Sequence, residues 1–261
     1  MCLIVFSVNQ HPEFPLVMAA NRDEFFRRPT AGMDWWQSDL AGAEVLAGRD
    51  LLSGGTWLAV SRDGVVSAVT NVRESSDAPA ARSRGELPLM AQNLRSDELQ
   101  RSLLPDRNQY AGFNLVQLNS RGGWYFSNRD AHPGRYIHRG IFGLSNHLLQ
   151  TPWPKLLKLR TEVNQALRGT SAAQADQLHD TLVGQLQDTT PAPDQQLPDT
   201  GVGIETERFL SSPFIKSKDY GTRATTIVSL SRHGEMMVTE QSYGPNAEKS
   251  EHRRFRWQRS P

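Results

Sequence analysis

The residue best suited to nucleophilic chemistry is the chain's only cysteine, Cys2, which follows Met1 in the opening MCLIVFSVNQ. A thiolate is a strong nucleophile, but a thiol with a pKa of about 8.5 is mostly protonated at neutral pH and needs a base. Removal of Met1 would place a free α-amino group, with a pKa of about 7.7–8.0, on the same residue. Composition alone favours the alternative, in which Cys2 is a small buried residue of a first strand.

A dense polar cluster, Asn21-Arg22-Asp23-Glu24, directly follows the apolar segment PLVMAA. If the first two strands pair, the end of the second strand approaches Cys2. An amide, a fixed cation and two carboxylates are suited to lowering a thiol pKa and to binding substrate charge. A solvated turn is an equally good interpretation of these four residues taken alone.

Three asparagines each close an apolar segment: Asn71 in SAVTN, Asn114 in GFN and Asn146 in GLSN. Side-chain amides at strand ends are candidate donors to the oxyanion of a tetrahedral intermediate. Asparagine also favours turns, so each of them taken alone fits a structural role. Arg223, in YGTRATT, either binds a carboxylate or caps the sheet.

The histidines give no sign of a metal site, because no two of the seven have the i,i+4 spacing typical of a metal pair on a helix. Only His147, next to Asn146, lies near the proposed cleft. Axial haem ligation by a single histidine or by Cys2 stays open.

The composition limits the classes of binding partner and the cellular compartment that we expect. Lys and Arg number 29 and Asp and Glu 28, so the net charge of +1 gives no general attraction to nucleic acid or anionic lipid. A single cysteine excludes an internal disulfide, and no apolar stretch approaches the roughly 20 residues that cross a bilayer. With no export signal visible, we expect a cytoplasmic protein without a membrane span, whose oligomeric state stays open.

Antiparallel strands would position these residues. Hairpins are expected from residues 2–8 with 15–20, 56–60 with 65–71, and 111–118 with 123–128. Further strands are expected within 136–146, at 223–230 and 235–243, and at an edge, 252–257.

Helical spacing of apolar residues appears at 85–104, 152–169 and 171–186, followed by a Pro- and Asp-rich loop at about 187–203. Hairpins, then helices, then strands differ from the alternating order of a Rossmann fold, and no G-x-G-x-x-G motif is present. The pattern indicates an α+β fold of antiparallel sheets covered by helices.

Several segments resemble the NRDE family, whose eukaryotic members include the transport and Golgi organisation proteins. They are MCLIVF, NRDEFFRRPT, GGTWLAVSRDG, AVTNVRE, GLSN and YGTRATT. The resemblance spans nearly the whole chain, which implies one domain over residues 1–261. That family is in turn similar to N-terminal-nucleophile (Ntn) hydrolases of the penicillin V acylase and choloylglycine hydrolase branch. This similarity implies a four-layer αββα sandwich with an N-terminal cysteine.

Carried over residue by residue, the resemblance implies these catalytic residues: Cys2, Arg22, Asp23, Asn71, Asn146 and Arg223. The residues expected to bind ligand are Asn21, Glu24, Phe25, Arg27 and His147. One departure concerns Arg22 and Asp23, because the acylases separate their Arg and Asp by two residues. Adjacent residues of an extended strand point to opposite faces. Either a bulge corrects this or only one of the two side chains faces Cys2.

Two functions follow from these residues. In the first, Cys2 hydrolyses an amide or thioester bond of a small acyl compound, and no cofactor is required. In the second, the same cleft binds haem or an acyl-CoA or lipid without turnover, as the family's association with haem trafficking and acyl-CoA metabolism implies. The aromatic lining expected for such a binding cleft is Phe25, Phe26, Trp35 and Trp36.

Overall fold

The computed structural model describes residues 2–74 and 80–259, and describes Cys2 by its backbone alone. Within this part of the chain the strands form two antiparallel sheets. The first sheet has the order β10 (Gly140–Leu144), β1 (Cys2–Val8), β2 (Leu16–Phe25), β11 (Tyr220–Leu230), β12 (Glu235–Tyr243) and β13 (Lys249–Gln258). The second has the order β3 (Thr30–Ser38), β4 (Ala43–Asp50), β5 (Leu58–Val60), β6 (Val66–Asn71), β7 (Phe113–Asn119), β8 (Gly122–Ser127) and β9 (Arg135–Ile137).

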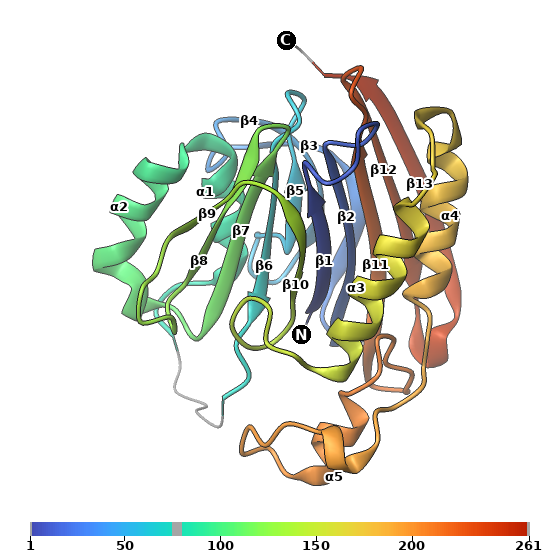
Figure 1. The fold of residues 1–261 in the computed structure, drawn as a ribbon. Helices are drawn as coiled ribbons and strands as arrows, with labels where there is room; N and C mark the ends of the chain where they lie inside the picture. The colour runs from blue at the N-terminus through green and yellow to red at the C-terminus, as the bar shows by residue number, and fades with distance from the viewer. Residues whose placement is uncertain (1, 75–79, 260–261) are drawn as a thin grey trace.

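Helices cover the outer faces of both sheets (Figure 1). The second sheet is covered by α1 (Leu87–Asn93) and α2 (Ser96–Asp106), and the first by α3 (Pro154–Leu167) and α4 (Ala175–Gln185). A short helix, α5 (Ile204–Phe209), lies beyond the end of the first sheet, below α3 in the view. The resulting order of helix, sheet, sheet and helix confirms the expected α+β sandwich.

Strand β1 shows how the sequence builds these layers. Ile4 and Phe6 pack in the core between the two sheets, whereas Leu3 and Val5 pack against the helices on the other side. Successive side chains of a strand point to opposite faces, so a strand buried on both faces reads as a continuous apolar run. The run Leu3-Ile4-Val5-Phe6 therefore marks a central strand of a layered fold.

Parts of the secondary structure differ from the sequence prediction. Strand β2 continues through Phe25, so the NRDE residues lie within a paired strand and not in a turn after it. The helix expected at 85–104 is broken at Leu94, whose backbone is extended. Strands β3 and β4 and helix α5 carry too many polar residues to be recognised by periodicity alone.

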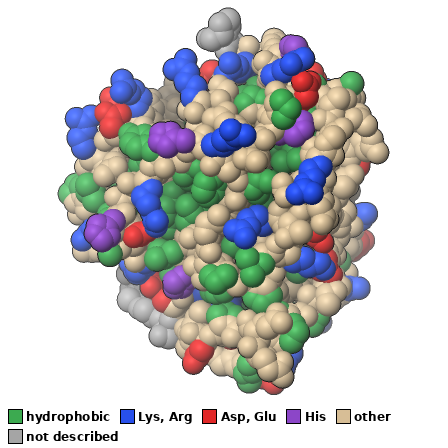
Figure 2. All heavy atoms as spheres, viewed as in Figure 1, with side chains coloured by type: hydrophobic (Ala, Val, Ile, Leu, Met, Phe, Trp, Pro, Cys, Tyr) green, Lys and Arg blue, Asp and Glu red, His purple; other side chains and the backbone are tan. Residues whose placement is uncertain are grey.

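The distribution of charged side chains on the surface agrees with the near-zero net charge of the chain. On the face shown in Figure 2, basic side chains are interspersed with acidic, histidine and apolar ones. None of the helices in the described part of the chain is both long and apolar enough to cross a membrane.

Candidate functional site

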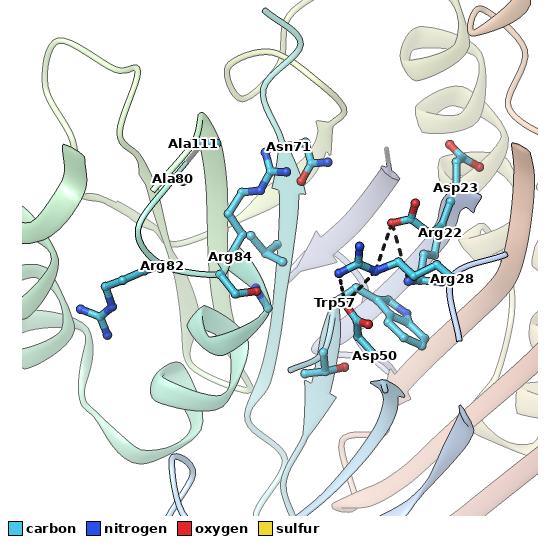
Figure 3. Close-up of a pocket in the computed structure, with 15 residues that line it drawn as sticks. Arg22, Asp23, Arg28, Asp50, Trp57, Asn71, Ala80, Arg82, Arg84 and Ala111 are labelled. Atoms are coloured by element: carbon cyan, nitrogen blue, oxygen red, sulfur yellow. Dashed lines mark hydrogen bonds and ion pairs between the residues drawn. The ribbon is translucent and has the colours of Figure 1, made fainter. Parts of the chain in front are cut away.

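A cleft of about 320 Å³ opens between the two sheets, and we call it the first cleft (Figure 3). The end of β2 forms one wall. The loop after β2, the end of β4, the segment that enters β5, the end of β6, the segment that leads to α1 and the segment that enters β7 supply the rest. The charged and polar lining residues that matter below are Arg22, Glu24, Arg28, Asp50, Trp57, Asn71, Arg82 and Arg84.

Arg22 connects this cleft to the chain's N-terminal end. Its guanidinium lies over the Trp57 ring, 4.2 Å from the ring centroid, and 3.9 Å from a carboxylate oxygen of Glu24. In the β1–β2 ladder the Cα of Arg22 is paired with the Cα of Cys2. The backbone of Cys2 therefore lies beside the cleft, whereas the expected position of its thiol falls outside the described residues.

Asp23 is also among the residues that line the first cleft, but its side chain points to the opposite side of β2 from that of Arg22. Its carboxylate accepts a 2.6 Å hydrogen bond from the Thr222 hydroxyl, and Figure 3 shows it pointing away from Arg28 and Trp57. Burial raises the pKa of this carboxyl, and the nearby Lys155 and the Thr222 hydrogen bond partly oppose the rise. The β1–β2 register runs unbroken to Arg22, and the bulge lies in β11 at Arg223. No bulge in β2 therefore turns Arg22 and Asp23 towards one side.

The side chain of Asn21 lies on the same face of β2 as that of Asp23, and its hydrogen bonds have a structural role. Its amide nitrogen donates to the carbonyls of Leu186 and Pro213, each at 2.9 Å, and its amide oxygen accepts from Thr225 at 2.6 Å. These bonds fasten both ends of the long segment between α4 and β11 to the sheet. The side chain of Asn21, which was expected to bind ligand, therefore does not face the first cleft.

The structure brings Asn71 and Asn146 together. Asn146 is fully buried just after β10, and its amide nitrogen donates to the main-chain carbonyl of Asn71 at 3.0 Å. The β1–β10 register pairs Ile4 with Leu144, so two residues further along it Asn146 reaches the level of Cys2. Asn71 itself lines the first cleft, across from Arg22 in Figure 3.

Asn114 differs from these two. Its amide nitrogen donates to Thr70 and to the carbonyl of His147, both at 3.0 Å, and its oxygen accepts from Tyr125 at 2.8 Å. These three bonds give Asn114 a structural role between β6, β7 and β8.

Other predicted residues lie outside the first cleft. Phe25 is 45% exposed against Tyr220, and the exposed Arg27 lies over the Phe25 ring. The exposed His147 shares a 2.9 Å hydrogen bond with Thr151. Arg223 donates to the Phe25 carbonyl and to the Thr30 hydroxyl, each at 3.2 Å, and lines a separate cleft.

The expected aromatic lining is distributed differently. Trp36 packs on the outer face of the second sheet, and Trp35 packs edge-on against Trp257 at 5.1 Å. The tryptophan in the wall of the cleft is Trp57, whose place depends on Gly48. A Cβ at Gly48 would lie 2.1 Å from the Trp57 ring.

Several cleft residues were not anticipated from the sequence. Arg28 forms a 2.6 Å ion pair with Asp50, and this hydrogen bond raises the pKa of Arg28. Arg82 and Arg84 enter from a polar segment before α1. Trp57 lies in the recognised segment GGTWLAVSRDG, which was a usable signal, whereas Asp50, Arg82 and Arg84 stand in stretches without a periodic pattern. Among the described residues, no group of three or more His, Cys, Asp and Glu side chains is arranged to hold a metal ion.

Comparisons with known proteins cover nearly the whole chain. Residues 1–245 match the family "Transport and Golgi organisation 2". The Transport and Golgi organization protein 2 homolog of Bos taurus is 35% identical, and the Mus musculus homolog is 31% identical; in both cases 93% of each chain is covered.

A solved structure resembles the fold. It is the C2A mutant of conjugated bile acid hydrolase from Clostridium perfringens, with a TM-score of 0.50 and 8% sequence identity. The match covers 100% of this chain and 98% of that one. At this level of identity the likeness shows a shared Ntn-hydrolase-like fold and leaves the chemistry to be argued from this chain's residues.

Proposed function

The chain belongs to the Transport and Golgi organisation 2 family, and we propose that it hydrolyses an amide or thioester bond through Cys2, once Met1 has been removed. The observation that carries this proposal is the register that pairs Cys2 with Arg22 beside the first cleft. Alternate positions of a strand share one face, so position 2 belongs to the same face of β1 as Ile4 and Phe6, which pack between the sheets. The reaction class is proposed from the fold likeness to the conjugated bile acid hydrolase.

The proposed reaction begins when the Cys2 thiol loses its proton to the α-amino group and the sulfur attacks the substrate carbonyl. The negative oxygen that forms is stabilised by amide N–H groups, with Asn71 and Asn146 as the proposed donors. Asn146 has two amide hydrogens, of which one is engaged by the Asn71 carbonyl. The amine then protonates the leaving amine or thiol, and water releases the acyl group from sulfur.

Arg22 and Asp23 take different parts in this proposal. Arg22 lies on the cleft side, where a guanidinium stacked on Trp57 can contact an anionic part of the substrate. Asp23 lies on the other face, beside Thr222, so its proposed role is to stabilise the structure around the N-terminal end of β1. This separates two residues to which the resemblance to the acylases assigns a shared catalytic role.

A second candidate is binding of haem or an acyl-CoA without turnover. It is favoured by the arginines in both walls of the first cleft, Arg22 and Arg28 on one side and Arg82 and Arg84 on the other. Guanidinium groups bind carboxylates and phosphates, which both ligand classes carry.

The test compares two forms with the same cleft, one processed to begin at Cys2 and one with an N-terminal extension that cannot be removed. Intact-protein mass spectrometry first establishes whether Met1 is absent. Both forms are then incubated with a panel of acyl amides and acyl thioesters. We expect an acyl adduct and product release in the processed form alone, because only that form has the free amine.

The single cysteine makes the readout specific, since a thiol-directed reagent can modify only Cys2. Prior alkylation, Cys2→Ala and Cys2→Ser should each abolish adduct and turnover. Undiminished turnover in Cys2→Ala would remove the nucleophile assignment. Equal binding of haem or acyl-CoA by both forms, with no adduct in a protein shown to lack Met1, would establish the binding function instead.

A further inference from the structure

A second cleft, of about 410 Å³, lies where β3 of one sheet meets β11, β12 and β13 of the other. It shares Arg22 and Trp57 with the first cleft, and the remaining lining residues are different. Among them is Arg223, the bulge residue of β11. The stacked pair of Arg22 and Trp57 is thus the common wall of two spaces.

Arg223 carries a positive charge that no ion pair neutralises. Its Nη1 donates to the Phe25 and Arg28 carbonyls and to the Thr30 hydroxyl, all neutral groups. Within residues 2–74 and 80–259, no carboxylate lies in ion-pair distance of Arg223, and its buried Nε has no hydrogen-bond partner. A buried donor without an acceptor is costly, so this N–H calls for a ligand.

The lowered pKa of Arg223 agrees with the lack of an ion pair between its guanidinium and any described carboxylate. Burial lowers the pKa of Arg223, and repulsion from the nearby charge of Arg22 lowers it further. Glu24 and Asp50 oppose this shift only by attraction at longer range. Two guanidinium groups that repel each other across a shared space are stabilised when an anion lies between them.

The acidic residues of the second cleft do not supply that anion. Glu251 is engaged by Arg253 in a 2.9 Å ion pair. Glu240 is 1% exposed, and burial raises the pKa of its carboxyl, which favours the neutral acid. One oxygen of Glu240 also accepts the backbone N–H of Met33 at 2.7 Å. Neither carboxylate of the second cleft therefore forms an ion pair with Arg223.

We propose that the second cleft is an oxyanion-binding site, in which a carboxylate or phosphate group of a ligand bridges Arg22 and Arg223 and accepts the Nε–H of Arg223. Planar guanidinium groups suit both anions because they present two parallel donors to one group. The proposal does not depend on turnover at Cys2, since neither arginine needs the thiol in order to bind an anion.

The direct test follows the Arg223 Nε–H signal by ¹H–¹⁵N NMR, with the signal identified by its loss in Arg223→Lys. Inorganic phosphate and acetate are titrated in separate arms at constant ionic strength. We expect a saturable shift of this signal with at least one anion, and the tighter arm identifies the ligand group as phosphate or carboxylate. Absence of a saturable shift in both arms would overturn the proposal.

Variants supply the second test. Arg223→Gln should weaken binding of the tighter anion by about tenfold or more, because a charge-assisted pair is lost. Arg49→Gln is the matched control, since the exposed Arg49 also stacks on an aromatic ring, that of Trp36, and should change binding by less than about twofold. Equal binding in these two variants would contradict the site.

A third variant avoids removing the hydrogen bonds that Arg223 makes to the loop after β2. Ala31 is a partly exposed residue of the second cleft. Ala31→Glu leaves every arginine contact in place and adds a carboxylate that competes with the ligand. Anion binding should fall about tenfold or more in Ala31→Glu, and an unchanged affinity would count against the proposal.

Discussion

Asn146 and Asn71 are joined by a hydrogen bond that crosses from one sheet to the other. The Asn146 amide nitrogen donates to the Asn71 carbonyl over 3.0 Å, and the carbonyl of Asn146 accepts the N–H of Arg73 at 2.7 Å. The end of β10 is thereby fixed to the end of β6. This connection links the two sheets at the level of Cys2, where the proposed chemistry would take place.

Replacing Asn146 should therefore affect both stability and activity. Asn146→Ala leaves the partly buried Asn71 carbonyl without its donor and removes a fully buried side chain, which should lower the free energy of unfolding by about 1–3 kcal/mol. Urea denaturation measures this loss. Asn108→Ala, at an exposed asparagine, is the control and should stay within about 0.5 kcal/mol of the parent chain. Similar values for the two variants would show that the bond between the sheets is energetically unimportant.

The ion pair between Arg73 and Glu207 should be a strong determinant of stability. Both side chains are buried, at 4% and 2% exposure, and Glu207 also accepts the N–H of Thr200 at 3.0 Å. Glu207→Ala leaves a buried guanidinium without its counter-ion and should cost about 3–5 kcal/mol. Because Glu207 lies in α5, limited proteolysis should also cut the segment 187–203 faster.

The exposed pair of Arg62 and Glu44 provides the control, with a 2.9 Å separation at 50% and 44% exposure. Glu44→Ala should cost less than about 1 kcal/mol, because solvent screens exposed charges. The double variant Arg73→Met with Glu207→Leu should recover much of the loss. If it is as unstable as Glu207→Ala, the loss of packing is responsible and not the unpaired charge.

His179 should make stability depend on pH. It is fully buried between the Thr239 and Ser229 hydroxyls, at 2.9 and 2.8 Å, and burial lowers its pKa to about 3. Below pH ~6.5 the unfolded chain binds a proton at this residue that the folded chain does not. Stability due to neutral His179 is therefore complete above that pH and is lost as the pH falls towards 3, by at most about 1.4 kcal/mol per pH unit.

The measurement is the unfolding free energy of the parent chain and of His179→Gln at several pH values between about 7.5 and 4. The advantage of the parent chain should shrink as the pH falls. His252→Gln, at an exposed histidine of β13, should show no such convergence. A constant difference between the parent chain and His179→Gln would mean that His179 binds a proton equally well in the folded and the unfolded chain, and would contradict the lowered pKa.

The layers of the fold could be predicted because apolar periodicity records them directly. The runs in β1 and β2, the hairpin of β5 and β6 and the helices α3 and α4 all follow from local patterns. Strands β3 and β4 could not be predicted in the same way. Residues such as Asp34 and Glu44 are exposed on them, and the pairing is set by partners elsewhere in the chain.

The site was predictable only in part, for a similar reason. Asn71 and Asn146 could be predicted because each closes an apolar segment in the sequence. Arg22 and Asp23 face apart because adjacent side chains of a strand point to opposite faces. Asp50 and Arg82 carry no local signal, because their place in the cleft is decided by contacts made after the sheets have packed.

Gly48 should be required for the wall that the two clefts share. It lies in β4, and a Cβ added there would come within 2.1 Å of the Trp57 ring, which supports the Arg22 guanidinium. Gly48→Ala must displace this ring and should cost about 1–3 kcal/mol. Gly184→Ala is the matched control, because no atom lies within 4 Å of the added Cβ in helix α4, and it should be neutral or stabilising. The clash is isolated by repeating Gly48→Ala in a Trp57→Ala background, where the cost should largely disappear. An equal cost in both backgrounds, measured by urea denaturation, would mean that the backbone of β4 and not the Trp57 ring excludes the methyl group.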